Sequence, residues 1–108
     1  MNRREQIEAM FASDPEDTFL RYALAMEWAA SDTPEVSLEW FEGLMNDSPP
    51  YVPAFFMAGQ TLAGCGQIDQ ARDVLRRGID QARSQGDLHA AAEMSEFLAS
   101  LGHLGESG

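Results

Sequence analysis

The chain has 108 residues, of which 44% are hydrophobic and 23% charged, and eighteen acidic residues against seven basic ones give a formal net charge of −11. A surface this negative repels phosphates and anionic lipid headgroups, so nucleic acids and membrane surfaces are excluded as expected partners. No apolar run is long enough to span a bilayer. The length suits one folded domain.

The number of cysteines and the N-terminal segment indicate in which cellular compartment the protein is expected. Cys65 is the single cysteine, so no internal disulfide can form. No N-terminal stretch combines the basic start and apolar run of a secretory signal peptide. We therefore expect a reducing, cytoplasmic setting. All basic residues are arginine, which fits adaptation to high salt and fits a GC-rich genome equally well.

Residues typical of helix N-termini and C-termini occur along the whole chain. Asn2, with Glu5 three residues later, is predicted to cap a first helix over 3–12. Capping residues, first-turn prolines and turn glycines predict the remaining helices near 17–31, 34–46, 52–64, 68–84 and 87–101. No stretch alternates apolar and polar residues over strand length outside these helical patterns, so no strand is expected. Gly102 followed by Leu104 is predicted to end the last helix, before a loose tail over 105–108.

A period of 34 residues relates successive parts of the chain. At this offset large, aromatic and small residues recur in columns, which are Tyr22 with Phe56, Ala25 with Gly59, Trp28 with Leu62, Ile7 with Phe41 and Leu75, Met10 with Leu44, and Phe11 with Met45 and Ile79. A repeated helical hairpin is the simplest cause. The small residues Ala25 and Gly59 are expected to let two helices approach closely, while Trp28 and Phe41 fill the seam and Trp40, one position off the column, stays partly exposed.

The repeated unit resembles the tetratricopeptide repeat (TPR), whose pattern is an aromatic, a Leu-small pair, a second aromatic, a small residue, a further aromatic and a closing proline. The first copy has Arg21, Leu24-Ala25, Trp28, Ser37, Phe41 and Pro49 at these positions. The second copy has Phe55, Ala58-Gly59, Leu62, Ala71 and Leu75, with Arg83 in place of the proline. Arg21 and Leu62 depart from the aromatic residues that the family prefers.

The resemblance implies an all-α fold in which antiparallel helical hairpins stack as a short right-handed solenoid of about five helices. The expected organisation is a single TPR-like domain over 1–104, made of a half-unit 3–12, repeat one 15–48, repeat two 49–84 and a closing helix 87–101. The closing helix fits the columns only with two residues inserted after Arg83, which places Ala91, Met94-Ser95 and Leu98 on the seam.

In TPR proteins the first helix of each hairpin lines the inner face, and the resemblance implies that a ligand binds there. The expected partner-binding groove therefore consists of Phe19, Tyr22, Met26, Phe56 and Gln60. Aromatic residues at helical spacing are more often core than ligand contacts, so both interpretations stay open for Tyr22 and Phe56. Carboxylates are expected to edge the groove, namely Glu27, Glu39, Glu42, Glu93 and Glu96.

These features predict a protein-interaction module that binds a peptide or helix of a partner protein in an apolar groove with acidic rims. A protein or peptide with apolar anchors and neighbouring Lys or Arg residues would complement such a groove. The alternative is a homo-oligomerisation module that associates through exposed terminal faces, with Met10 and Phe11 at one end and Leu98 and Leu101 at the other. A monomer and a homodimer are both compatible with the sequence.

The sequence gives little indication of a metal site, a reactive cysteine or a catalytic site. His89, Glu93 and Glu96 share one face of a helix, but no second helix contributes a ligand, so no metal site is expected. Cys65 lies between Gly64 and Gly66 without a cationic neighbour, and His103 falls in the tail. The chain lacks a phosphate-binding glycine loop, an HExxH motif and a paired-cysteine motif. We expect no catalytic residue, no cofactor and no enzymatic activity.

Overall fold

The computed structural model describes residues 2–102 and contains six α-helices and no strand in that part of the chain. The helices are α1 (Arg3–Ser13), α2 (Thr18–Ala29), α3 (Val36–Met45), α4 (Val52–Gly64), α5 (Ile68–Ser84) and α6 (Leu88–Ser100). The all-α prediction is confirmed: each of the six predicted helical ranges corresponds to one helix, so the helix total within residues 2–102 is six where about five were expected for the solenoid. The predictions for His103, Leu104 and the tail 105–108 lie outside the described residues.

Side chains near the predicted boundaries cap the N-termini of three helices. The Asn2 carboxamide oxygen accepts a hydrogen bond from the Glu5 backbone N–H at 2.8 Å, as predicted for α1. Asp17 and Asp87 act in the same way at the starts of α2 and α6. Such caps satisfy backbone donors that the first turn of a helix leaves unpaired.

Helix ends follow local turn chemistry. Gly66 and Gly86 adopt φ values of 82° and 80°, which favour glycine, in the turns after α4 and α5. The predicted bounds of these two helices, 52–64 and 68–84, are correct. Helix α2 is shorter than predicted because the Ser31 hydroxyl donates to the Trp28 carbonyl at 2.6 Å in a turn that follows Ala29.

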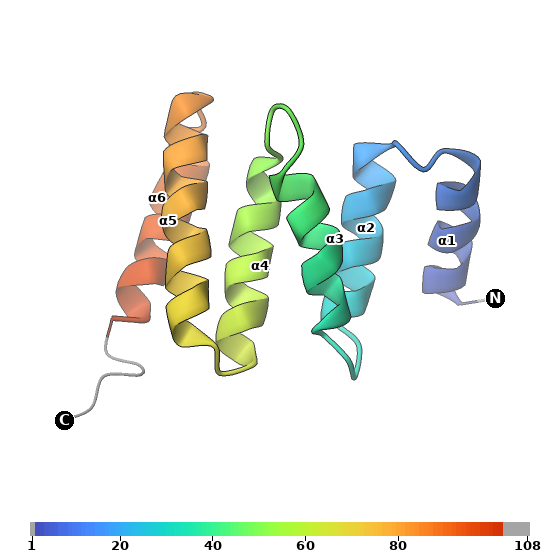
Figure 1. The fold of residues 1–108 in the computed structure, drawn as a ribbon, viewed down its shortest axis with the longest axis horizontal. Helices are drawn as coiled ribbons and strands as arrows, with labels where there is room; N and C mark the ends of the chain where they lie inside the picture. Colours follow the sequence, from blue (N-terminus) through green and yellow to red (C-terminus); the bar gives the residue numbers. More distant parts are fainter. Residues whose placement is uncertain (1, 103–108) are drawn as a thin grey trace.

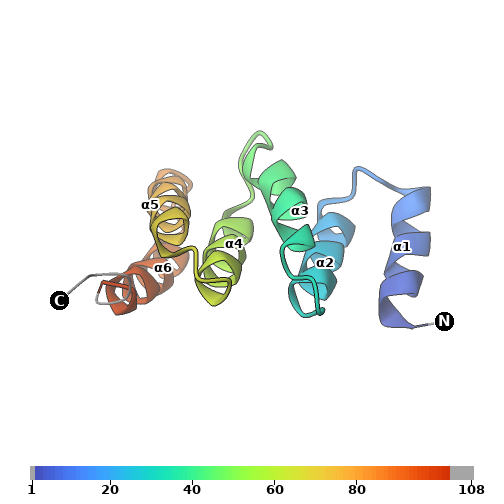
Figure 2. The same cartoon turned by 60° about the horizontal axis from the view of Figure 1, so that its bottom comes forward.

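Consecutive helices run side by side in alternating directions from α1 to α6 (Figure 1). Seen after rotation, α2, α4 and α6 form one row, and α3 and α5 form a second row above it (Figure 2). This is the arrangement expected when helical hairpins stack, because the first helices of successive hairpins then lie on the same side. We call the row of α2, α4 and α6 the inner row.

The repeat columns form the main core between the two rows. Phe41 and Leu75, which share a column, are both fully buried. Ala25 is also fully buried, and a Cβ atom added at Gly59 would lie 2.7 Å from Leu75 Cδ2. The predicted close approach at the small residues is therefore confirmed. In the closing helix Ala91 and Met94 are buried as the shifted alignment predicted.

A second close contact, at Gly78 of α5, was not predicted. A Cβ atom at this position would lie 2.4 Å from Phe55 Cβ and 2.6 Å from Met94 Sδ. Helix α5 thus passes between α4 and α6 with no room for a side chain at Gly78. The contact explains why a residue that usually weakens a helix stands in the middle of a 17-residue one.

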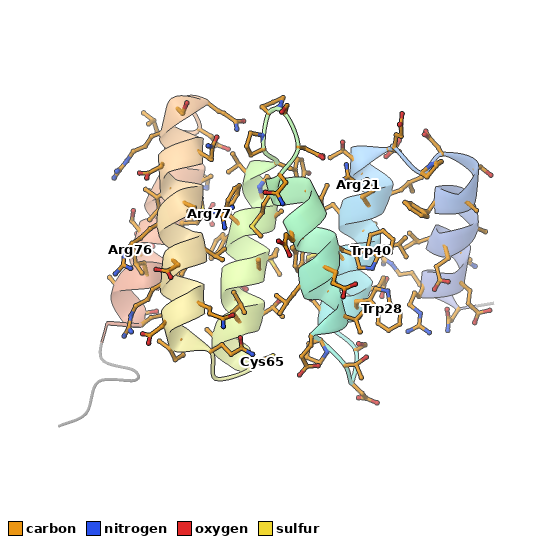
Figure 3. The ribbon with its side chains drawn as sticks, viewed as in Figure 1. Arg21, Trp28, Trp40, Cys65, Arg76 and Arg77 are labelled. Carbon is orange, nitrogen blue, oxygen red and sulfur yellow. The ribbon has the colours of Figure 1, made fainter. Side chains whose placement is uncertain are left out.

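Helix α1 rests on a smaller core of its own, formed by Ile7, Leu20 and Leu24. The Phe11 and Trp40 rings meet edge to face at 5.2 Å, and Trp40 is half-buried as predicted. Trp28 was predicted to fill the seam, and this is wrong, because it is only half-buried and the Arg4 guanidinium lies 4.4 Å from its ring centroid. Figure 3 shows both tryptophans on the side of the molecule that faces α1.

Arg21 stands at the position where the repeat pattern prefers an aromatic residue. Its guanidinium donates to both carboxylate oxygens of Asp47, at 2.7 and 3.2 Å. The pair joins α2 to the loop after α3, and both side chains are partly buried. A bidentate ion pair of this kind fixes geometry as well as adding attraction, so Arg21 holds α2 against the loop after α3.

Candidate functional site

Two adjoining pockets lie along the inner row. The first has a volume of about 370 Å³ and is lined by residues of α2, α4 and the turn after α2, including Met26, Met57 and Gln60. The second, of about 250 Å³, lies against α2, α4 and α6 and is lined by Tyr22, Phe56 and Met57 among others. Because Met57 lines both pockets, they adjoin. We call the surface formed by Tyr22, Met26, Phe56, Met57 and Gln60 the inner groove.

Four of the five predicted groove residues lie in these pockets. Met26 and Gln60 face the first pocket, and Tyr22 and Phe56 face the second. Phe19 lines neither pocket, although 72% of it is exposed. The structure thus brings together residues from both repeat copies and leaves Phe19 apart from them, in the first turn of α2.

Tyr22 and Phe56 combine the two interpretations that the sequence left open. Both are half-buried against the main core. The Tyr22 ring lies 5.2 Å from Tyr51 and 6.3 Å from Phe41, and burial, followed by the influence of Tyr51, raises the pKa of the Tyr22 phenol. The Phe56 ring lies 5.9 Å from the Phe97 ring. One side of each aromatic ring is therefore packed, and the remainder lines the groove.

Met57 and Phe97 were missed by the sequence analysis. At the 34-residue offset Met57 aligns with Ala23, so comparison of the two copies gives no large apolar column there. Phe97 lies in the closing helix, where the alignment holds only after an insertion. Pairing Met57 with Gln60 at helical spacing would have indicated that both face the same side of α4.

The predicted acidic rim is wrong for Glu27 and Glu39. Glu27 forms an ion pair with Arg3 of α1 at 2.6 Å and so faces α1. Glu39 of α3 lines a separate pocket with Arg21 and Trp40. The carboxylates that line the second groove pocket are Glu93 of α6 and Asp87, which caps the start of that helix.

The candidate metal and thiol groups have structural partners. His89 Nε2 lies 3.0 Å from Glu93 Oε1, and within residues 2–102 no three His, Cys, Asp or Glu side chains are grouped so that they could hold a metal ion. The Cys65 thiol donates to Glu35 Oε1 at 3.8 Å. Partial burial, followed by the Glu35 carboxylate, raises the pKa of the Cys65 thiol, which disfavours the reactive thiolate.

The terminal faces expected for homo-oligomerisation are largely covered. Leu101 is 2% exposed, and Leu98 packs against the main core. Phe11 packs on Trp40, so only Met10 of the four predicted residues is strongly exposed, at 55%. The expected apolar end face is therefore wrong for Leu101, which is buried, while Met10 is exposed as expected. None of the helices within residues 2–102 has the length and apolar character required to cross a membrane.

Comparison with known proteins identifies the fold. No family model matches the chain. A curated TPR repeat-containing protein of Pseudomonas aeruginosa is 26% identical over 97 residues, which cover 90% of this chain and 92% of that protein. The solution structure of a protein from Bordetella parapertussis is similar with a TM-score of 0.81 and 29% identity, over 94% of this chain and 88% of the other.

A second solved structure carries the family name and a higher identity. The solution structure of a tetratricopeptide repeat domain protein from Salinibacter ruber is 32% identical, with a TM-score of 0.80, over 88% of this chain and 96% of that one. Repeats of this fold generally serve protein interaction. The 34-residue period, the stacked hairpins and these relatives together show that the chain belongs to the tetratricopeptide repeat family.

Proposed function

We propose that this protein binds a peptide or a helix of a partner protein in the inner groove. The observation that carries the proposal is the pair of adjoining pockets along the inner row, lined by the half-buried side chains of Tyr22, Met26, Phe56 and Met57. Concave apolar surfaces with few polar groups are typical binding sites. Aromatic and methionine side chains also bury large areas at low cost and adapt to ligands of different shape.

Polar groups in the first pocket suit a polypeptide ligand. The Gln60 side-chain amide lines this pocket and offers both donors and an acceptor, which match the backbone groups of a bound segment. The nearby Thr61 hydroxyl donates to the Met57 carbonyl at 2.8 Å and is therefore already engaged. Gln60 is thus the side chain expected to orient a peptide backbone, while the apolar residues hold its side chains.

The proposal is tested with a peptide selected on the purified protein from a random twelve-residue display library. Truncating Met26 or Phe56 to alanine is expected to weaken its binding by about 1–3 kcal/mol, because each variant removes apolar surface from a groove pocket. Met10→Ala serves as a matched control, since Met10 is exposed on α1 and lines neither groove pocket. Titration calorimetry measures the affinities.

Melting curves of the same variants separate binding from folding. The expected outcome is a folded protein with lost affinity for Met26→Ala and Phe56→Ala and full affinity for Met10→Ala. Failure to select any peptide, or a peptide whose affinity is the same for all three variants, would show that the inner groove is not the binding surface.

A further inference from the structure

A third pocket opens beside the inner groove, between α4 and α6. It has a volume of about 340 Å³ and is lined by Phe56, Glu93, Glu96, Phe97 and Ser100. The two phenyl rings are tilted by 56° with centroids 5.9 Å apart. The Ser100 hydroxyl donates to the Phe97 carbonyl at 2.6 Å, so the two carboxylates are the main polar groups that face a ligand. We call this site the aromatic-acidic pocket.

The charged side chains that line this pocket are all acidic. No arginine lines the aromatic-acidic pocket or either pocket of the inner groove, and α4 contains no charged residue. The arginines of the C-terminal half all belong to α5, in the other row, and Figure 3 shows Arg76 and Arg77 there. Arg76 pairs with Asp73 at 3.5 Å, and the Arg77 guanidinium lies 5.6 Å from the Phe55 ring centroid.

The α6 side of the inner row therefore presents carboxylates in pockets that no arginine lines, while Arg72 of α5 donates to the Leu101 carbonyl just beyond α6 at 2.7 Å. Glu93 has His89 at 3.0 Å, but that histidine is 88% exposed at its side chain and lies in the first turn of α6. Glu96 has no ion-pair partner within the part of the chain that the structure describes, and its carboxylate borders the Phe56 and Phe97 rings. A positive charge from outside would be attracted to this position.

We propose that the aromatic-acidic pocket takes a basic side chain, preferably an arginine, of the polypeptide bound in the inner groove. A cation within about 6 Å of an aromatic face is attracted by the ring, and a guanidinium can stack on a ring while its N–H groups donate to a carboxylate. Phe97 and Phe56 provide the rings, and Glu93 and Glu96 provide the acceptors. A neutral or acidic side chain would leave the two carboxylates uncompensated.

The location of the pocket adds a constraint on the ligand. Phe56 and Glu93 line both the aromatic-acidic pocket and the second pocket of the inner groove. The basic side chain therefore lies next to an apolar side chain that fills the groove. This inference rests on the proposed function and narrows it to ligands in which an arginine adjoins an apolar anchor.

The test uses the tripeptide acetyl-Leu-Arg-Leu-amide and the same tripeptide with citrulline, which has nearly the shape of arginine but no charge. Titrations followed by the backbone amide signals of the labelled protein are expected to show shifts at Phe56, Glu93 and Phe97. The arginine peptide is expected to bind about tenfold more tightly than the citrulline peptide, which is the typical effect of a cation between an aromatic ring and a carboxylate. Equal affinities, or the absence of shifts at these residues, would overturn the inference.

Two matched variants test whether the preference for arginine over citrulline arises in this pocket. Glu96→Gln is expected to reduce the preference for arginine over citrulline to about threefold or less, since it removes one carboxylate and keeps the side-chain shape. Glu39→Gln is the control, because Glu39 lies on α3 in a different pocket and should leave the preference intact. Equal losses in the two variants would mean that the net charge, and not this pocket, selects arginine. A library peptide that still depends on Met26 while arginine and citrulline bind equally would leave the proposed function standing and remove only this inference.

Discussion

Phe55→Ala is expected to lower the free energy of unfolding by about 3–5 kcal/mol, the usual cost of removing a large aromatic side chain from a packed core. Phe55 is fully buried, and its Cβ atom is in close contact with Gly78 of α5. Truncation would leave a cavity where α4 meets α5. Phe56, the next residue along α4, is half-buried and lines the groove, so Phe56→Ala is expected to cost only about 1–2 kcal/mol.

The two variants control for each other, because they remove the same atoms from neighbouring positions of one helix. Urea unfolding followed by circular dichroism measures both free energies. A smaller cost for Phe55→Ala than for Phe56→Ala would mean that α4 is rotated about its axis, and the assignment of Phe56 to the groove would fail with it.

Gly78→Ala is expected to destabilise the protein by about 1–3 kcal/mol, although alanine is the better helix former by about 1 kcal/mol. The added Cβ atom would lie 2.4 Å from Phe55 Cβ, and that atom is fixed to the backbone of α4. Relief requires α4 and α5 to separate, which loosens the packing along both helices.

Gly64→Ala is the matched control for this effect. A Cβ atom at Gly64, at the end of α4, would meet no atom within 4 Å. This substitution is expected to leave stability unchanged or to raise it by up to about 1 kcal/mol, through the smaller conformational freedom of the unfolded chain. Thermal unfolding compares the two variants. Equal melting temperatures would contradict the tight packing of α5 between α4 and α6.

The repeat period made most of the fold predictable. Residues such as Phe41 and Leu75 recur at a fixed spacing because each hairpin buries the same positions, so their column identified the core. Gly78 escaped prediction because a glycine adds no apolar signal, and only the approach of three helices shows why it is required. The prediction that Trp28 lies in the seam was wrong because this ring packs against Arg4, which belongs to a helix that precedes the first full repeat.

The inner groove was predictable to the extent that the family pattern assigns inner positions. Tyr22 and Phe56 follow from that pattern, whereas Phe97 comes from a closing helix that departs from it. The acidic rim could not be placed from sequence, because ion pairing decides which carboxylates face the groove. Glu27 is turned toward α1 by Arg3, a contact between residues far apart in the chain.

The central claim is that a polypeptide binds along the inner row, and amide chemical-shift mapping with a library-selected peptide tests it most directly. The largest shifts are predicted at the inner groove, on the exposed sides of α2 and α4, and on the side of α6 that carries Glu93. These helices share one side of the molecule (Figure 2), so a single extended or helical segment can touch all three. Shifts confined to α1, α3 or α5, with Met26, Phe56 and Met57 unchanged, would contradict the claim.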